Sequence, residues 1–256
     1  MDNPVASNIL GTAGAVLWSI QLLPQIIKNY RNHSTQGLHP LMYLSWAAAG
    51  IPLGTYNVVQ NLNIALQVQP HILIFLSLVT WAQIKHYSDQ WPLVKILVGV
   101  VASGVGIGGV EAGLYFALRL ARDRHIEWPM TFMAVLAAVL LCVGVVRYYV
   151  EIYRSRSVQG ISFMFVFLDA MGDLVSILAL VFAPRLDAVG MVMYAAELAL
   201  WIGIGILGLH YRFRVWVMKK LGHETKSTLP ESGLESTEGA TEGDRISPDQ
   251  KNIGAG

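Results

Sequence analysis

Seven long apolar segments, separated by short polar connections, constrain this chain more than any other feature of its sequence. They span residues 9–27, 41–59, 64–84, 94–118, 129–150, 162–182 and 188–207. An α-helix needs about 20 mostly apolar residues to cross a bilayer, because its backbone polar groups must be satisfied within the helix. We therefore predict an all-α integral membrane protein with seven transmembrane helices.

The composition agrees with a membrane location, and it is more acidic and less apolar at the C-terminal end. Hydrophobic residues make up 54% of the 256 residues and charged residues only 14%, which is too apolar for the polar surface of one soluble domain. Of the 17 acidic residues, seven lie beyond position 221, among few large apolar ones. Such a stretch cannot bury enough surface to offset the entropy of ordering it, so we predict a disordered acidic cytosolic tail at 222–256, free to bind cytosolic partners.

Lys and Arg are distributed unequally between the two sides of the predicted bundle. Eleven fall on one side: Lys28, Arg31, Lys85, Lys95, Arg147, Arg154, Arg156, Arg212, Arg214, Lys219 and Lys220; four fall on the other: Arg119, Arg122, Arg124 and Arg185. Because cytoplasmic loops are enriched in Lys and Arg, we expect the C-terminus in the cytosol. With seven crossings, the N-terminus then faces the lumen or the exterior.

A short motif occurs twice, at an offset of 123 residues. Tyr30, Arg31, Ser34, Gln36 and Gly37 recur as Tyr153, Arg154, Ser157, Gln159 and Gly160. Four crossings separate the copies, so both units have the same orientation in the membrane. We therefore predict two parallel three-helix bundles, at residues 1–90 and 129–221, joined by a linker helix and lumenal loop at 91–128.

The sequence LPQIIKNYR at residues 23–31, continued by Ser34 and Gly37, resembles the signature of the PQ-loop family. That family includes cystinosin, basic amino-acid exporters of vacuoles and lysosomes and, more distantly, the SWEET sugar carriers and KDEL receptors. The resemblance covers residues 9–210, with a pattern similar to fungal members, and it implies a vacuolar or other endomembrane location. The second copy departs from the signature, because Arg147 and Tyr148 stand where Pro and Gln would be.

Pro24 and Gln25 lie near the cytosolic end of the first predicted helix. Proline lacks an N–H and crowds the carbonyl of Ile20, so the helix should loosen there, and we interpret Pro24 as a hinge. Gln25 either bonds a freed carbonyl or lines a polar path, which makes it a candidate for substrate binding. The alternative is a static kink with a satisfied amide. Whether the second half also bends stays open, because Arg147 replaces the proline.

Asp169 and Asp173 lie one turn apart on one face of the sixth predicted helix, inside the membrane. An ionised carboxylate in hydrocarbon costs several kcal/mol, so such residues face the bundle interior and pair, titrate or contact substrate. The stretch 167–172 resembles the cystinosin segment whose aspartate couples proton movement to transport, which implies that Asp169 is the proton acceptor. Asp173 is a candidate for binding a cationic substrate. A structural pair bonded to a neighbouring helix is the alternative.

Three further titratable residues lie within predicted helices. Glu197, near the middle of the seventh helix, is a candidate for substrate binding. Glu111 in the fourth helix is either structural or functional. His71, near the lumenal side of the third helix, either relays protons or is solvated at the interface.

The remaining motifs exclude several function classes. No phosphate loop, zinc-ligand spacing or hydrolase triad is present in the sequence, so we expect neither an enzyme nor a cofactor, a metal or a nucleic-acid partner. The expected partners are membrane lipid, protons and a small solute. We predict a secondary carrier that exports a small amino acid, with cationic ones among the candidates, from an acidic organelle by proton coupling. The alternatives are a sorting receptor similar to the KDEL receptors, and a protein that handles lipid or sugar.

Overall fold

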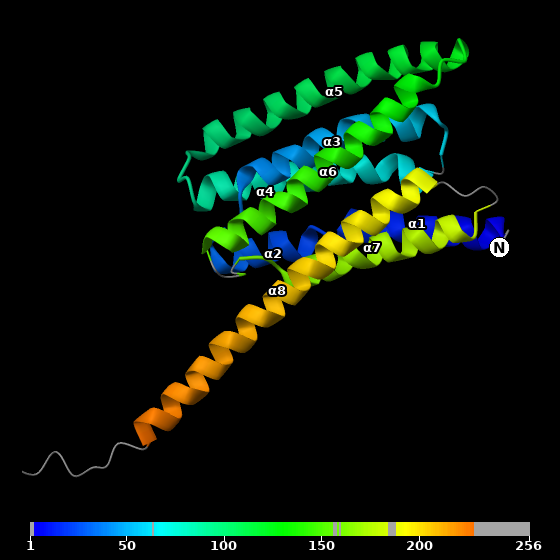
Figure 1. Ribbon diagram of the computed structural model, residues 1–256. Coiled ribbons are helices and arrows are strands. Elements are labelled where there is room, and N and C mark those ends of the chain that lie inside the picture. The colour runs from blue at the N-terminus through cyan, green and yellow to red at the C-terminus, as the bar shows by residue number, and fades with distance from the viewer. Residues whose placement is uncertain (1–2, 63, 156–157, 159, 184–187, 228–256) are drawn as a thin grey trace, which may run out of the picture. The chain divides into compact units, whose positions relative to one another are not determined.

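The computed structural model describes residues 3–62, 64–155, 158, 160–183 and 188–227, and folds them into α-helices without strands (Figure 1). The helices are α1 (Pro4–Ile20), α2 (Leu23–Asn32), α3 (Pro40–Val59), α4 (Ile64–Tyr87), α5 (Leu93–Asp123), α6 (Trp128–Ser155), α7 (Phe163–Val181) and α8 (Ala188–Ser227). The first predicted span is therefore divided into α1 and α2.

Six helical segments of the described residues are long and apolar enough to cross a membrane. They are Pro4–Asn32, Ile64–Tyr87, Leu93–Asp123, Trp128–Ser155, Phe163–Val181 and Gly190–Tyr211. The prediction of an all-α membrane protein is confirmed, but helix α3, predicted as a seventh span, is not among the six. Its small and polar residues lower its hydropathy, and it packs against α4, α5 and α6. A helix covered by its neighbours presents less surface to lipid and needs fewer large apolar side chains.

The helices begin and turn where the sequence supplies caps and glycines. The side chain of Asn3 accepts a hydrogen bond from the Ala6 N–H at 3.1 Å, and Ser162 caps α7 in the same way. Gly37 and Gly160, which are equivalent in the repeated motif, both have a left-handed backbone, with φ of 81° and 86°. The two motif loops touch, because a Cβ on Gly160 would collide with the carbonyl oxygen of Gln36.

Two contacts between distant segments join the first and second halves of the chain. Helix α3 packs along α6, and α1 packs along α7. Within the first half, α4 contacts both α1 and α3, whereas α5 contacts α3, α4 and α6 from the side. At each of these two contacts a tryptophan indole packs closely against a glycine. A Cβ atom on Gly144 would collide with the Trp46 indole, and a Cβ atom on Gly172 would collide with the Trp18 indole.

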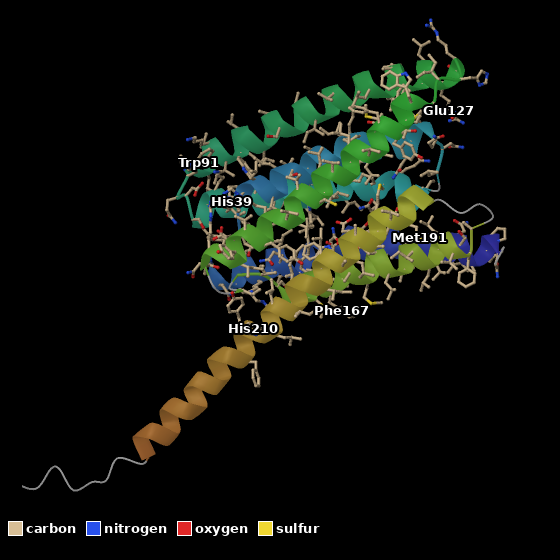
Figure 2. All side chains as sticks on the ribbon, in the orientation of Figure 1. His39, Trp91, Glu127, Phe167, Met191 and His210 are labelled. Carbon is tan, nitrogen blue, oxygen red and sulfur yellow. The ribbon has the colours of Figure 1, made fainter. Side chains whose placement is uncertain are left out.

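Two ends of the helical bundle are distinguished by their connections. The α4–α5 connection with Trp91, together with His39 before α3, lies at one end, and Glu127 in the α5–α6 connection lies at the other (Figure 2). At the first end Lys85 and Lys95 place their Nζ atoms 4.8 and 3.7 Å from the centroid of the Trp91 ring. We call it the basic end, and the end with Glu127 the open end.

The chain divides into two compact units, Met1–Arg212 and Phe213–Gly256. The first unit contains the candidate site. Helix α8 continues to Ser227, so residues 222–227, which were expected to begin a disordered tail, are helical. Glu224 and Lys226 favour helix, and this stretch continues the long helix that precedes it. The rest of the expected tail, 228–256, lies outside the described residues.

Candidate functional site

Two aspartates lie on the inward face of α7. Asp169 and Asp173 are 1% and 0% exposed, and they share this face with Gly172, where the Trp18 indole packs closely. Oδ2 of Asp169 and both carboxyl oxygens of Asp173 lack a hydrogen-bond partner within the described part of the chain. Buried polar atoms are almost always hydrogen-bonded, so unsatisfied carboxyl oxygens are a strong indication of a site for an ion, a proton or a solute.

A third carboxyl group, from Glu197 on α8, joins this pair. Its charge acts on both aspartates, which places the three groups in one electrostatic cluster. Ion pairs among the described residues join only His71 with Glu111 and Lys85 with Asp89, so none neutralises this cluster. Within the same residues, no set of three His, Cys, Asp or Glu side chains has the arrangement of a metal site. The cluster therefore consists of three acidic groups without a cationic partner among these residues.

A cavity of about 770 Å³ leads to these carboxyl groups. It extends from the connections at the open end, where Gln60 and Glu127 line it, inward to Asp169 and Glu197. Asp173 does not line this space. Pockets of about 300–1,000 Å³ typically hold small molecules. We call this space the acidic cavity.

Side chains that sequence reasoning missed form the rest of the inner wall. Gln21 is buried and its Oε1 has no partner among the described residues, and Gln69 adds a second buried amide. Trp18 on α1 and Tyr194 on α8 meet with ring centroids 5.4 Å apart. Trp18, Gln21 and Gln25 follow i, i+3, i+7 spacing, so a helical projection was the signal that could have placed Gln21 on the same face.

The break in the first span is adjacent to Pro24. Helix α1 ends at Ile20, residues 21–22 form a turn, and α2 begins at Leu23 with Pro24 in its first turn. Helix α6 instead continues without a break through Arg147, at the equivalent place in the second half. The first half therefore has a helix break beside a proline, as a hinge requires, whereas the second half has a continuous helix at the equivalent place.

Gln25 lies outside the acidic cavity, and its amide is fully used. Its Oε1 accepts from the Ser162 N–H at 2.6 Å, and its Nε2 donates to the Gly160 carbonyl at 2.9 Å and to Asn29 Oδ1 at 2.8 Å. Lys28 adds a bond from Nζ to the Ile161 carbonyl at 2.7 Å. These contacts attach α2 to the second motif loop at the basic end.

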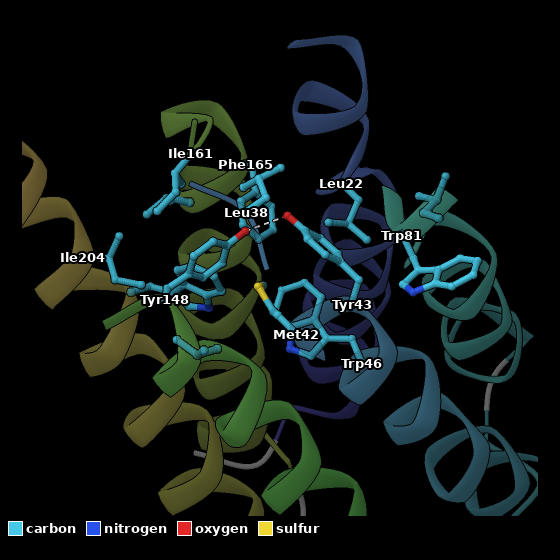
Figure 3. Close-up of a cluster of buried hydrophobic side chains, with 14 of the residues drawn as sticks. Leu22, Leu38, Met42, Tyr43, Trp46, Trp81, Tyr148, Ile161, Phe165 and Ile204 are labelled. Carbon is cyan, nitrogen blue, oxygen red and sulfur yellow. Dashed lines mark hydrogen bonds between the residues drawn. The ribbon is translucent and has the colours of Figure 1, made fainter. Parts of the chain in front are cut away.

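Aromatic side chains from both halves belong to one buried hydrophobic cluster (Figure 3). Tyr43 on α3 and Tyr148 on α6 share a hydrogen bond, with the hydroxyl oxygens 2.7 Å apart. Phe165 and Trp201 pack edge to face with centroids 5.1 Å apart, and Trp46 contacts both rings. All five side chains are buried, and neither they nor any described residue of the connections at the basic end lines the acidic cavity.

Comparisons with known proteins match this architecture to one family. The PQ loop repeat model matches residues 6–66 and 149–188, which include the two motif loops. An uncharacterised protein of Schizosaccharomyces pombe is 44% identical over 218 residues, covering 85% of this chain and 76% of that protein. An uncharacterised membrane protein of Saccharomyces cerevisiae is 33% identical over 209 residues, covering 80% of this chain and 66% of that protein.

Proposed function

This chain belongs to the PQ-loop repeat family of membrane proteins, and on that premise we propose that it is a secondary carrier for a small solute. One observation carries the proposal above the others. The acidic cavity joins the open end to the carboxyl groups of Asp169 and Glu197, whereas buried side chains from both halves separate it from the basic end. A cavity closed at one end only is the arrangement expected of one state in alternating access.

In this proposal the carrier consists of two parallel bundles, α1–α4 and α6–α8, joined by α5, and α3 is the seventh membrane crossing. The contacts between halves support it. The repeat offset of 123 makes α1 equivalent to α6 and α3 equivalent to α7. The contact of α1 with α7 therefore corresponds to the contact of α6 with α3, as a two-fold axis along the membrane normal requires.

We assign proton binding to Asp169 and recognition of a cationic group to Glu197, which lines the acidic cavity; Asp173, outside that lining, adds negative charge to the cluster. Asp169 lines the acidic cavity and is accessible to protons from the open end. Protonation removes a charge that has no cationic partner among the described residues, and this change favours one access state over the other. Asp169 and Glu197 line the acidic cavity together with Trp18 and Tyr194, and this lining suits a small, positively charged amino acid, because carboxylates and aromatic faces both attract cations.

The open end faces the lumen of an acidic organelle in this account, and the basic end faces the cytosol. Solute and proton enter from the lumen, and the closed end then opens by bending at Pro24. Opening requires the separation of Tyr43 from Tyr148 and of Gln25 from the Gly160 carbonyl. Export toward the cytosol follows from the proton gradient.

Flux measurements on the purified protein in liposomes test this function. Labelled lysine, arginine, cystine and glucose are offered with and without a proton gradient, to wild type, Asp169→Asn and, as a matched control at an exposed loop, Asp89→Asn. We expect gradient-driven flux of one solute in wild type and the control and its loss in Asp169→Asn. Binding of a solute without flux would instead support a sorting receptor, whose ligand stays on one side of the membrane.

A further inference from the structure

A second pair of titratable side chains lies away from the acidic cavity, where α3, α4 and α5 meet. His71 on α4 places Nε2 3.5 Å from Glu111 Oε2 on α5, and a Cβ on Gly54 of α3 would lie 3.2–3.3 Å from both side chains. The pair lines a separate cavity of about 390 Å³ that shares no lining residue with the acidic cavity.

The hydrogen bonds of His71 restrict where its protons can be. Nδ1 lies 2.9 Å from the carbonyl oxygen of Gln67. A carbonyl only accepts, so Nδ1 must carry a hydrogen. A hydrogen between Nε2 and Glu111 is then an additional, exchangeable proton, whether the imidazole or the carboxyl group holds it. With this proton the pair has no net charge, and without it a carboxylate faces the lone pair of Nε2.

The neighbouring side chains that the structure describes do not share this proton with the pair. The Glu111 side chain is 17% exposed and its Oε1 is buried without a partner within the described residues, whereas His71 is 47% exposed. Among the described lining residues, the other titratable group is Tyr115, whose hydroxyl accepts from Arg119 Nη1 at 3.2 Å. From α3, Thr55 is also engaged, because it donates to the Ile51 carbonyl.

Helix α5 has few buried side chains, so a polar contact at its middle contributes to how it is held. Its buried residues are Ile96 and Leu118, near its two ends; between them Val100 and Ile107 are partly buried against a small cluster of α3 and α4 side chains, and the other valines are exposed. Glu111 lies between these two anchors and is the residue through which the middle of α5 forms an ion pair with α4. A change in that contact therefore acts on the middle of α5.

We propose that His71 and Glu111 form a second proton-binding site, which holds the middle of α5 against α3 and α4 while the proton is bound. Loss of the proton leaves a carboxylate against an imidazole lone pair and releases that contact. The site is independent of the acidic cavity and of the solute. It makes the position of α5 sensitive to the pH at the open end.

A double-mutant cycle on the full chain in lipid nanodiscs tests this site. The melting temperature is measured at about pH 5 and about pH 8 for wild type, His71→Leu, Glu111→Leu and the double variant. We expect a coupling of about 2–4 °C between the two positions at the lower pH, falling by more than half at the higher pH. Additive effects at both pH values, or a coupling that does not change with pH, would overturn the proposal.

Glu111→Gln provides a second measurement that keeps the shape of the side chain. The amide donates to Nε2 when the imidazole is neutral and accepts from the Nε2 hydrogen when it is protonated, so this variant keeps a hydrogen bond at every pH; it should match wild type at the lower pH and melt above it at the higher pH. Its effect should add to that of Asp169→Asn, because the two sites share no partner. A constant difference from wild type across pH, or an effect that disappears in Asp169→Asn, would refute a separate proton site.

Discussion

The hydroxyl oxygens of Tyr43 and Tyr148 lie 2.7 Å apart, between α3 in the first half and α6 in the second. Tyr148 is the repeat equivalent of Gln25, at the offset of 123. Each of these two residues bonds across to the opposite half, Gln25 through the Gly160 carbonyl and Tyr148 through Tyr43. Equivalent positions of the two motif copies thus carry different side chains, and each side chain makes a contact between the two halves.

Replacing one tyrosine of this pair by phenylalanine should cost more than replacing both. A single Tyr43→Phe or Tyr148→Phe change leaves one buried hydroxyl without its partner, at about 1–3 kcal/mol, whereas the double change leaves none. We expect the double variant to be at least as stable as either single one in thermal unfolding. Effects of the two changes that add would show that the hydroxyls do not act as a pair.

Gly172→Ala should separate α1 from α7. A methyl group there collides with the Trp18 indole, and overpacking costs about 1–3 kcal/mol, which lowers Tm by about 2–4 °C for each kcal/mol. Gly106→Ala is the matched control, because nothing lies within 4 Å of a Cβ at that position and alanine favours the helix. Adding Trp18→Phe to Gly172→Ala should recover part of the loss. Equal melting of the two alanine variants would contradict this packing.

The sequence predicted the membrane-spanning class and the location of the main break well. Of the seven apolar runs predicted to span a bilayer, six correspond to helices long and apolar enough to do so, and Pro24 predicts a weakness that the structure has at residues 21–22. Helix α3 shows the limit of hydropathy. Because α3 is in contact with three other helices, it can contain polar and small residues. Its hydropathy alone therefore does not distinguish a membrane span covered by other helices from a helix of a soluble protein.

Within the candidate site, sequence reasoning identified charged groups better than their neighbours. Carboxylates inside apolar runs are rare enough to mark Asp169, Asp173 and Glu197. The contact of Tyr43 with Tyr148 spans 105 residues, and only the packing of α3 on α6 creates it. The pairing of His71 with Glu111 likewise depends on how α4 and α5 pack, which neither helix encodes alone.

Cys142, the one cysteine of the chain, is a natural reporter for the acidic cavity, which it lines. We expect a small, membrane-impermeant cationic thiol reagent to modify it from the open end and not from the basic end of protein in sealed vesicles. Glu197→Gln should slow the cationic reagent and leave a neutral one unchanged, because only the former is attracted by the carboxylate. Cys142→Ser is the control for background labelling. Equal modification from both faces would contradict a closed basic end.

His39 predicts a pH dependence outside the membrane spans. Its Nδ1 accepts from the Leu41 N–H at 3.2 Å at the start of α3, and burial together with the nearby Arg147 lowers its pKa below the usual 6.5. The unfolded chain therefore binds the proton more readily, and this contribution to stability, present above about pH 6.5, is lost as the pH falls below it. His39→Asn also caps the helix but does not titrate in this range. The difference in Tm between the two proteins should thus shrink or reverse on acidification; a constant difference would refute the effect.

The role assigned to Asp169 is tested most directly by separating exchange from accumulation in proteoliposomes. Counterflow of labelled against unlabelled solute needs the cavity to alternate, whereas accumulation against a solute gradient also needs proton coupling. For Asp169→Asn, which keeps the size of the side chain, the account predicts that counterflow persists while proton-driven accumulation is abolished. An Asp169→Asn protein that still accumulates solute on a proton gradient, as wild type would, contradicts it.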